Sequence, residues 1–477
     1  MGSSASKGGW RAAAVIAAAL VGSVVLPVGP AAAVHGGVPG DFNGDGYRDA
    51  VLPAPGANVA GKEAAGAVVV LYGSSSGLAT ARRKTLTQNT TGIPGTAEAY
   101  DRFGAATATE DLNRDGYADL VISSPYEDTS KGTDAGAVTV VWGSRNGLAG
   151  GTDLPTPSSD PTYFGLDLAA RSGGSGGKTQ VLAGGYDGSV LFKGSFSRSG
   201  SFGSATLNQD TPSLESVALG DLNGDTTPDR VLISSRTSGL TGGEIYLNPS
   251  RSGQPLQRGN GLISATGDLN GDGYADLVVG DPDEPEVAGA DGGLGGRVSV
   301  WYGSATGIAA DATPVHLTQN TAGVPDTSEK YDAFGGSVAV ADLNRDGLAD
   351  IVVGTPYEST GGKKRAGRVT VIPGRASGAL GSGSYSFTQD TSGVPSASET
   401  DDFFGTTVSA GDVNKDGRPE LFVGASGEND STGAVFMLPG GSTHPTGTGS
   451  RVITGPAVGL NQQHGTLLGG DGLLWVI

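Results

Sequence analysis

The nine residues Asp111-Leu-Asn-Arg-Asp-Gly-Tyr-Ala-Asp119, followed directly by the apolar run Leu120-Val-Ile122, decide how this chain folds. The same nine-residue pattern recurs six times, and each copy leads at once into an apolar, β-branched run. The copies are Asp41–Asp49, Asp111–Asp119, Asp221–Asp229, Asp268–Asp276, Asp342–Asp350 and Asp412–Glu420. Self-similarity of this kind is typical of a repeat architecture.

Each repeat continues with strand and hairpin signals. A second alternating run follows the first, as in Gly136–Trp142, and it closes on a Gly-rich turn such as Gly143–Gly147. Alternation with period two, β-branched runs and glycine turns predict strands joined by hairpins. No window carries a clean helical period. We therefore expect each repeat to form an antiparallel sheet of about four strands.

The spacing of the loops predicts seven repeats rather than six. A gap of 110 residues separates Asp111 from Asp221, whereas the other gaps run from 47 to 74. Within the long gap, Phe164-Gly165 stands where Phe-Gly precedes other acidic loops, and Arg171–Lys178 replaces the loop itself. Seven four-stranded sheets around an axis form an all-β, seven-bladed β-propeller.

The ends of the chain predict a leader and a closed ring. Lys7 and Arg11 precede the apolar stretch Ala12–Leu26 and the small residues Ala31–Ala33. This is the pattern of a cleaved signal peptide over residues 1–33, and the apolar run is short for a membrane anchor. Residues 34–477 would then form the propeller, with a C-terminal strand near Asn461–Leu468 completing the first blade.

Composition excludes several classes of function. The formal net charge is −19, and both nucleic acid and anionic lipid require clusters of Lys and Arg. The chain has no cysteine, which excludes disulfides and thiol nucleophiles. Its four histidines, His35, His316, His444 and His464, form no paired metal-binding spacing. We therefore expect an exported protein without a membrane span and without a nucleic-acid partner.

The acidic loop supplies oxygen ligands for a hard cation. Positions 1, 3, 5 and 9 carry side-chain oxygens, position 7 offers a backbone carbonyl, and glycine at position 6 permits a sharp turn. Ca²⁺ accepts this number of ligands, whereas Mg²⁺ prefers fewer from protein. A single loop of this kind is often only a solvated turn, but six copies in one register favour metal.

We accordingly expect up to six Ca²⁺ ions, with the weakest site at Asp221–Asp229, where Thr226 replaces glycine and Pro228 follows. The predicted ligands are Asp41, Asn43, Asp45, Tyr47 and Asp49; Asp111, Asn113, Asp115, Tyr117 and Asp119; Asp221, Asn223, Asp225, Thr227 and Asp229; Asp268, Asn270, Asp272, Tyr274 and Asp276; Asp342, Asn344, Asp346, Leu348 and Asp350; and Asp412, Asn414, Asp416, Arg418 and Glu420.

Phe-Gly, the acidic loop and a Gly-x-Pro segment such as Gly354-Thr-Pro356 together resemble FG-GAP repeats, which form the seven blades of the integrin α-subunit head. The resemblance covers about residues 35–470. It implies Ca²⁺ between the first two strands of a blade on one propeller face, and ligand contacts from loops on the opposite face. Integrins carry such loops in only some blades, and no integrin stalk or transmembrane helix is recognisable here, which favours a free-standing secreted relative.

Three near-identical segments lie between repeats: Gln88–Asp101, Gln319–Asp332 and Gln389–Asp402. By strand order they lie on the face opposite the acidic loops. One interpretation is an acidic rim for a cationic or polyhydroxylated ligand, and the other is a cap between blades that repeats because the packing repeats. The candidate rim residues are Glu98, Asp101, Glu329, Asp332, Glu399 and Asp402.

No catalytic residue is assigned. Gly73-Ser-Ser75-Ser-Gly77 matches the GxSxG elbow of serine hydrolases, but sister repeats have Arg145, Ala305 and Ala376 in place of Ser75. The sequence favours a secreted calcium-binding propeller that acts as an extracellular binding or adhesion module for a protein or glycan. The alternative is a Ca²⁺-dependent extracellular enzyme on the same fold, such as a polysaccharide lyase or a phospholipase-like protein.

Overall fold

The computed structural model describes Met1 and residues 40–156, 162–173, 178–211, 213–248, 254–283, 285 and 292–472. The signal peptide predicted for residues 1–33 therefore lies outside the described residues, apart from Met1. In the described ranges, no helix is long and apolar enough to cross a membrane.

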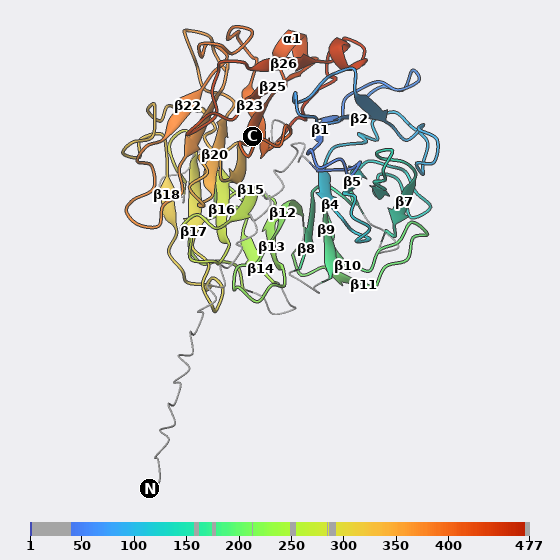
Figure 1. The fold of residues 1–477 in the computed structure, drawn as a ribbon, viewed down its shortest axis with the longest axis horizontal. Coiled ribbons are helices and arrows are strands. Elements are labelled where there is room, and N and C mark those ends of the chain that lie inside the picture. Colours follow the sequence, from blue (N-terminus) through green and yellow to red (C-terminus); the bar gives the residue numbers. More distant parts are fainter. Residues whose placement is uncertain are drawn as a thin grey trace.

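Seven antiparallel sheets surround a central axis, one blade after another along the chain (Figure 1). Five blades have four described strands, and the first and fourth have three. This confirms the seven-bladed all-β propeller, including the degenerate third blade. The strands are β1 (Ala50–Ala54), β2 (Ala67–Leu71) and β3 (Arg83–Leu86); β4 (Thr107–Glu110), β5 (Asp119–Ser124), β6 (Ala137–Val141) and β7 (Gly151–Leu154); β8 (Leu168–Ser172), β9 (Thr179–Gly185), β10 (Gly188–Lys193) and β11 (Ser204–Asn208); β12 (Leu214–Gly220), β13 (Asp229–Ser234) and β14 (Ile245–Leu247); β15 (Ile263–Gly267), β16 (Asp276–Asp281), β17 (Arg297–Trp301) and β18 (Val315–Leu317); β19 (Ser337–Ala341), β20 (Asp350–Thr355), β21 (Arg368–Ile372) and β22 (Tyr385–Phe387); and β23 (Phe404–Gly411), β24 (Glu420–Ala425), β25 (Ala434–Leu438) and β26 (Arg451–Thr454).

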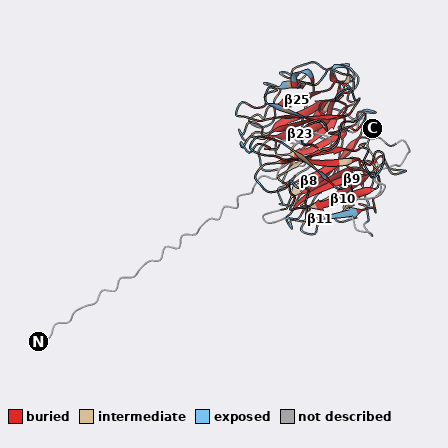
Figure 2. Ribbon diagram, turned by 90° about the vertical axis from the view of Figure 1, so that its right-hand side faces the viewer, coloured by how far each residue is buried: buried red, intermediate tan, exposed pale blue. Residues whose placement is uncertain are grey.

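Two short helical turns accompany the last blade: α1 (Glu428–Ser431) follows β24, and the 3₁₀ turn η1 (Pro456–Val458) follows β26. The outermost strand of a blade is the most exposed, as Figure 2 shows for β11 of the third blade. Its strands β9 and β10 are almost wholly buried and β8 is buried or half-buried, whereas four of the five residues of β11 are exposed. The short outermost strands therefore form the rim of the disc.

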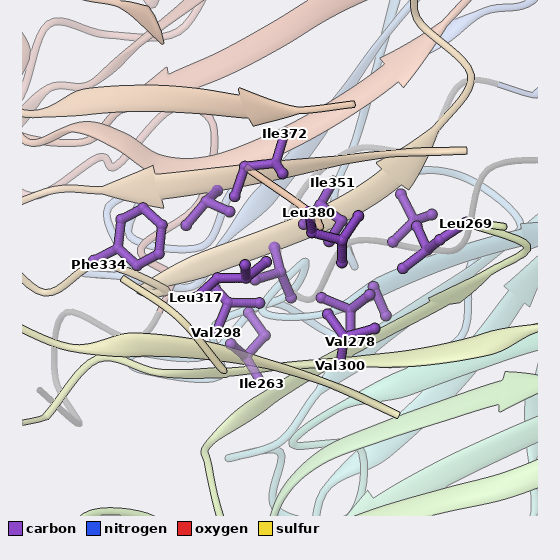
Figure 3. Close-up of a cluster of buried hydrophobic side chains, with 14 of the residues drawn as sticks. Ile263, Leu269, Val278, Val298, Val300, Leu317, Phe334, Ile351, Ile372 and Leu380 are labelled. Atoms are coloured by element: carbon purple, nitrogen blue, oxygen red, sulfur yellow. The ribbon is translucent and has the colours of Figure 1, made fainter. Parts of the chain in front are cut away.

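The second strand of each blade has a continuous apolar stretch because both of its faces are covered. Val278 of β16 packs into a cluster shared with the sixth blade, whereas its neighbours Leu277 and Val279 pack toward the fourth. Figure 3 shows Val278 among Val300 and Ile351 from two adjoining blades. Alternate residues of a strand point to opposite faces, so a strand between two neighbours reads as a continuous apolar run.

The described core divides into seven clusters, and each joins two adjacent blades. The one that joins the ends of the chain brings Leu52 of β1 and Val69 of β2 together with Phe422 of β24 and Val435 of β25. The last blade therefore packs on the first as neighbours do elsewhere in the ring.

The C-terminal segment also contacts the first blade, but not through a strand at Asn461–Leu468. The structure has turns and irregular backbone there, and the next residue, Gly469, donates its N–H to the carbonyl oxygen of Pro53 at 2.7 Å. Leu468-Gly469 occupies the place of Phe-Gly: a side chain at Gly433 would collide with the backbone of Leu468, as one at Gly66 would with Phe103. The cleavage point and the domain limits stay predictions.

Candidate metal loops and the opposite face

The six acidic loops all lie on one face of the propeller, because each joins the first and second strands of its blade, or in the first blade leads into β1. The turn between the third and fourth strands reaches the same face. We call this the loop face. The connections between second and third strands, and between blades, reach the other side, which we call the opposite face.

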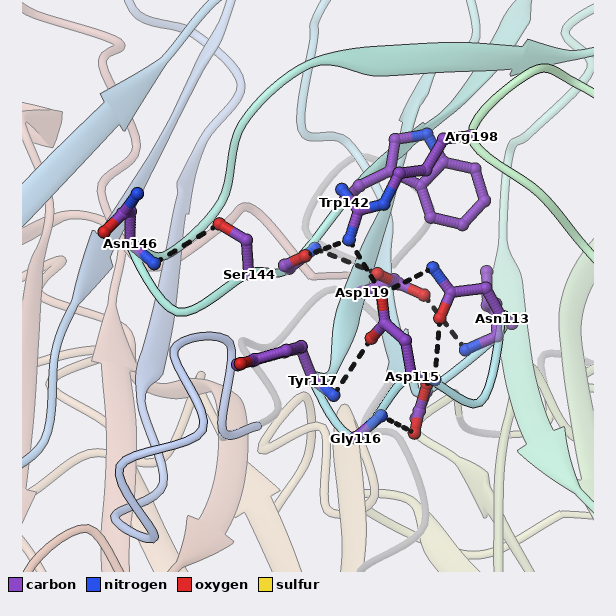
Figure 4. Close-up of polar contacts among 12 residues, drawn as sticks. Asn113, Asp115, Gly116, Tyr117, Asp119, Trp142, Ser144, Asn146 and Arg198 are labelled. Carbon is purple, nitrogen blue, oxygen red and sulfur yellow. Dashed lines mark hydrogen bonds and ion pairs between the residues drawn. The ribbon is translucent and has the colours of Figure 1, made fainter.

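Loop 111–119 shows the shared geometry (Figure 4). Asp111 accepts the N–H of Asp115 at 3.0 Å and that of Gly116 at 2.9 Å, one on each carboxylate oxygen. Asn113 Oδ1 accepts the N–H of Asp115 at 2.9 Å, and Asp115 Oδ1 accepts that of Tyr117 at 3.2 Å. The side chains at positions 1, 3 and 5 thus curl back onto the loop's own backbone and bring their oxygens to one side.

The carboxylate at position 9 ties two hairpins of the blade together. Asp119 accepts the N–H of Leu112, within the loop, at 3.0 Å and that of Gly143, in the turn after the third strand, at 2.9 Å. Asp49, Asp276 and Asp350 make the same two bonds in their own blades. The fourth and last blades differ, because Asn248 Nδ2 bonds Asp229 and Asn414 Nδ2 bonds Glu420 in place of the turn N–H.

Burial raises the pKa of the position-9 carboxyl groups of Asp49, Asp119, Asp276, Asp350 and Glu420 to about 7, despite hydrogen bonds that lower it. The charges at positions 1 and 5 raise it further. Keeping three carboxylates ionised in one loop therefore costs free energy, and a cation among them would offset that cost.

Glycine at position 6 is required by the backbone. Gly116 has φ +89°, a left-handed conformation that side chains oppose. The exception is Thr226, a β-branched residue held at φ +67°. In the same loop, Asp221 Oδ1 is buried with no hydrogen-bond partner. The loop predicted to be the weakest site is thus also the one in which a β-branched residue is held in a left-handed conformation and a carboxylate oxygen lacks a donor.

The loops are part of the seams between blades. Ser144 of the second blade donates its N–H to the carbonyl of Phe42 in the first loop at 3.0 Å, and Ser304 donates likewise to Leu222 at 3.1 Å. Basic side chains also reach position 5: Arg198, from the third blade, lies 2.8 Å from the carboxylate of Asp115. An ordered loop therefore supports the neighbouring blade as well as its own.

The donor set fits a hard cation, since each loop offers carboxylate, amide and carbonyl oxygens and no nitrogen or sulfur ligand. The carboxylates are not preorganised for a metal ion. Within the described ranges, no three His, Cys, Asp or Glu side chains lie close enough together to form a metal-binding group. The loop oxygens accept backbone N–H groups instead, so binding would require small shifts of these side chains.

On the opposite face, the six candidate rim residues divide into two groups. Asp101, Asp332 and Asp402 are buried, and each accepts the N–H of the Glu three residues before it, at 2.5, 2.6 and 2.7 Å. Glu98, Glu329 and Glu399 are exposed. The aspartates thus brace their own segments, as a cap between blades requires, and only the glutamates face solvent.

A strip of aromatic side chains lies on the opposite face over the second and third blades. The ring of Tyr163 lies 5.1 Å from that of Tyr126 and 6.3 Å from that of Tyr186. Tyr186 is 53% exposed, and the guanidinium of Arg102 lies 5.9 Å from the Tyr126 ring centre. Sequence analysis did not single out this strip, because its members come from three different connections.

An open pocket of about 530 Å³ lies between the fourth and fifth blades, lined by Glu244, Arg258 and His316 among others. His316 Nδ1 lies 2.9 Å from Ser299 Oγ. Ser299 is a fully buried residue in the middle of β17. The pair therefore does not present a nucleophile to a substrate.

These features define a closed β-propeller with acidic hairpin loops on one face. The FG-GAP repeat family matches residues 33–71, 103–141, 260–301, 334–372 and 404–437. Each matched stretch takes in the acidic loop of one blade and the strands around it. Five of the seven blades thus match FG-GAP repeats, and the fold is that of an integrin-alpha-like FG-GAP β-propeller.

Two curated relatives illustrate the similarity. The chain is 27% identical to phosphatidylinositol-glycan-specific phospholipase D of Bos taurus over 70% of its own length and 45% of that protein. It is 36% identical to integrin alpha-7 of Rattus norvegicus over 39% of its length and 14% of that protein. The chain thus spans less than half the length of these relatives. Among solved structures, an exotype rhamnogalacturonan lyase aligns with 92% of this chain and 81% of its own at 14% identity, with a TM-score of 0.42.

Proposed function

We propose that this chain is a secreted, calcium-loaded propeller that binds an extracellular protein or glycan through its opposite face. Calcium has a structural role in this proposal. Six loops of one chemistry lie in the seams between blades, where bound ions would neutralise the clustered carboxylates and stiffen the ring. Similarity to parts of an integrin alpha chain and of a phospholipase D supports an extracellular location.

The observation that carries the binding part is the strip of Tyr126, Tyr163 and Tyr186 beside Arg102. Tyrosine and arginine are enriched where binding energy concentrates, since they combine apolar area with polar tips. The exposed Glu98 belongs to the neighbouring inter-blade segment and supplies a charge that a cationic or hydroxyl-rich ligand would meet.

A pull-down tests this proposal. The mature protein is incubated with extracellular and cell-wall fractions in millimolar Ca²⁺ and eluted with EDTA, and protein and glycan in the eluate are identified separately. Tyr186→Ala should lose most of the captured partner. Tyr302→Ala is the matched control, because Tyr302 is 38% exposed but follows β17 on the loop face. Equal capture by both variants would place binding elsewhere.

The second candidate function is that of a Ca²⁺-dependent enzyme. The pocket lined by Glu244, Arg258 and His316 supports this candidate because it could hold a substrate. Turnover separates the two functions. A lyase would release unsaturated products from uronate polymers, and a phospholipase would release a headgroup, whereas a binding module releases neither. His316→Ala should abolish such turnover and leave partner capture intact.

A further inference from the structure

Two pairs of aromatic rings repeat on the opposite face. Tyr126 and Tyr163 form the pair between blades 2 and 3, and Tyr357 and Phe403 form the pair between blades 6 and 7. The ring centres lie 5.1 Å apart with an interplanar angle of 59° in the first pair, and 5.5 Å apart at 61° in the second. All four rings are half-buried. The fold therefore presents the same two-ring surface at two junctions between blades.

The same backbone contact holds the second ring of each pair. Tyr163 donates its N–H to the carbonyl oxygen of Asp134 at 2.8 Å, and Phe403 donates likewise to Arg365 at 3.1 Å. Arg365 thus stands where the other junction has Asp134. Its guanidinium lies 5.7 Å from the centre of the Phe403 ring. The two surfaces share their rings and differ in charge.

The charge difference extends along the whole connection between the second and third strands. In blade 6 this connection, residues 356–367, contains Lys363-Lys364-Arg365 and one carboxylate, which gives it a formal charge of +2; we call it the basic hairpin. The equivalent connections 55–66, 125–136 and 426–433 have formal charges of 0, −2 and −2. In a chain of net charge −19, the basic hairpin attracts anionic groups, which the acidic remainder of the chain repels.

The lysines of the basic hairpin lie beside the rings and are open to solvent. Asp401, two residues before Phe403, donates its N–H to the carbonyl oxygen of Lys364 at 3.0 Å. Lys363, Lys364 and Arg365 are all exposed. The guanidinium of Arg365 pairs with Asp401 at 2.6 Å, but within the described part of the chain neither lysine forms an ion pair. Two cations beside the aromatic pair are therefore available to a ligand.

We propose that the basic hairpin and the Tyr357–Phe403 pair bind an anionic polysaccharide whose sugars carry carboxylate groups. This inference rests on the proposed function, because it takes the opposite face as the binding surface. The apolar C–H face of a sugar ring packs on an aromatic ring, while the carboxylate meets the ammonium groups of Lys363 and Lys364. A polymer also suits a face that repeats the aromatic pair, since one chain of sugars offers many equivalent units.

Retention on polygalacturonate, a polymer of carboxylated sugars, tests the proposal. The double variant Lys363→Gln/Lys364→Gln should bind about fivefold more weakly than the unmodified chain, the effect of losing two exposed ionic contacts. The difference should vanish at about 1 M NaCl, where screening is strong. Lys62→Gln/Lys131→Gln is the matched control, because it removes the same charge from exposed positions in the equivalent connections of blades 1 and 2. Equal binding by the two double variants, or no binding by the unmodified chain, overturns the proposal.

Polyglutamate separates a glycan from an acidic polypeptide as the ligand. Phe403→Leu removes the ring and keeps an apolar side chain, so it should weaken binding to polygalacturonate and leave binding to polyglutamate unchanged. The same effect on both polymers, whether a loss or none, overturns the proposal. If Tyr186→Ala loses its captured partner while the lysine variant keeps its retention on polygalacturonate, this inference fails and the proposed function stands.

Discussion

The backbone N–H of Ser74, in the first blade, donates a 3.3 Å hydrogen bond to the carbonyl oxygen of Val413, in the last acidic loop. The same bond joins Ser144 to Phe42 between the first two blades. The first and last blades are therefore joined by the same contact that joins the first and second blades. Because that contact is made by the acidic loops, whatever orders the loops stabilises the whole ring.

Removing one loop ligand should remove one ion and its share of stability. At tenfold excess over the dissociation constant, one bound ion adds about 1.4 kcal/mol to the free energy of unfolding. In Asp45→Ala, the gap in unfolding free energy between Ca²⁺ and EDTA should narrow by roughly that amount. Chemical denaturation measures it. Asp187→Ala, an exposed aspartate outside every loop, should leave the gap unchanged.

Relaxing the strained loop should strengthen it. Thr226 holds φ +67°, which costs a β-branched residue about 1–2 kcal/mol. Thr226→Gly should therefore raise the melting temperature and the affinity of loop 221–229 for Ca²⁺. The reverse change, Gly116→Thr, should lower both in loop 111–119. A lower melting temperature for Thr226→Gly would show that the turn is not under strain.

Truncating a buried side chain between two blades should lower the free energy of unfolding more than any substitution in an acidic loop. Phe334 is fully buried in the cluster shared by the fifth and sixth blades. Phe334→Ala should lower the free energy of unfolding by about 3–5 kcal/mol, from lost burial and the cavity left behind. Leu207→Ala, on the exposed strand β11, should stay within about 0.5 kcal/mol of the unmodified chain.

The buried carboxyl group of Glu358 should make the free energy of unfolding depend on pH. Burial, with Asp332 and Asp326 beside it, raises the pKa of Glu358 to about 7, although Gln319 and Arg368 lower it. A group whose pKa is raised on folding stabilises the folded state below its unfolded pKa, and this contribution is lost as the pH rises through 7.

At saturating Ca²⁺, stability should therefore fall by up to about 3 kcal/mol between pH 5 and 7.5 on account of Glu358. Melts across this range should show a smaller fall for Glu358→Gln. The exposed Glu329 provides the control, since Glu329→Gln should follow the unmodified chain. Identical pH profiles for all three proteins would contradict the assignment.

Much of the fold could be predicted from the sequence because the repeat is local. The acidic loop, the apolar strand and the glycine turn fall within one short stretch, so Asp111–Gly147 contains the signals for the second and third strands of its blade. The degenerate third blade was recognisable from Phe164-Gly165 even without its loop. Closure of the ring was harder to predict from the sequence, because Leu468-Gly469 occupies the place of Phe-Gly without the phenylalanine.

The opposite face could not be derived in the same way. Whether Asp101 faces solvent or the backbone depends on the N–H of Glu98, which no composition rule reveals. The link between Gln88 and Glu127 joins two blades, so it lies outside any one repeat. Its signal was present as three glutamines, each followed 39 residues later by a glutamate, but only the structure shows that they touch.

A thermal melt with and without calcium tests the central claim most directly. The full chain is melted in millimolar Ca²⁺, after exhaustive EDTA, and after Ca²⁺ is restored. If six loops in the seams hold calcium, EDTA should lower the melting temperature by at least several degrees, and Ca²⁺ should restore it. A melting temperature that is the same in all three conditions would contradict the account of this protein as a calcium-loaded propeller.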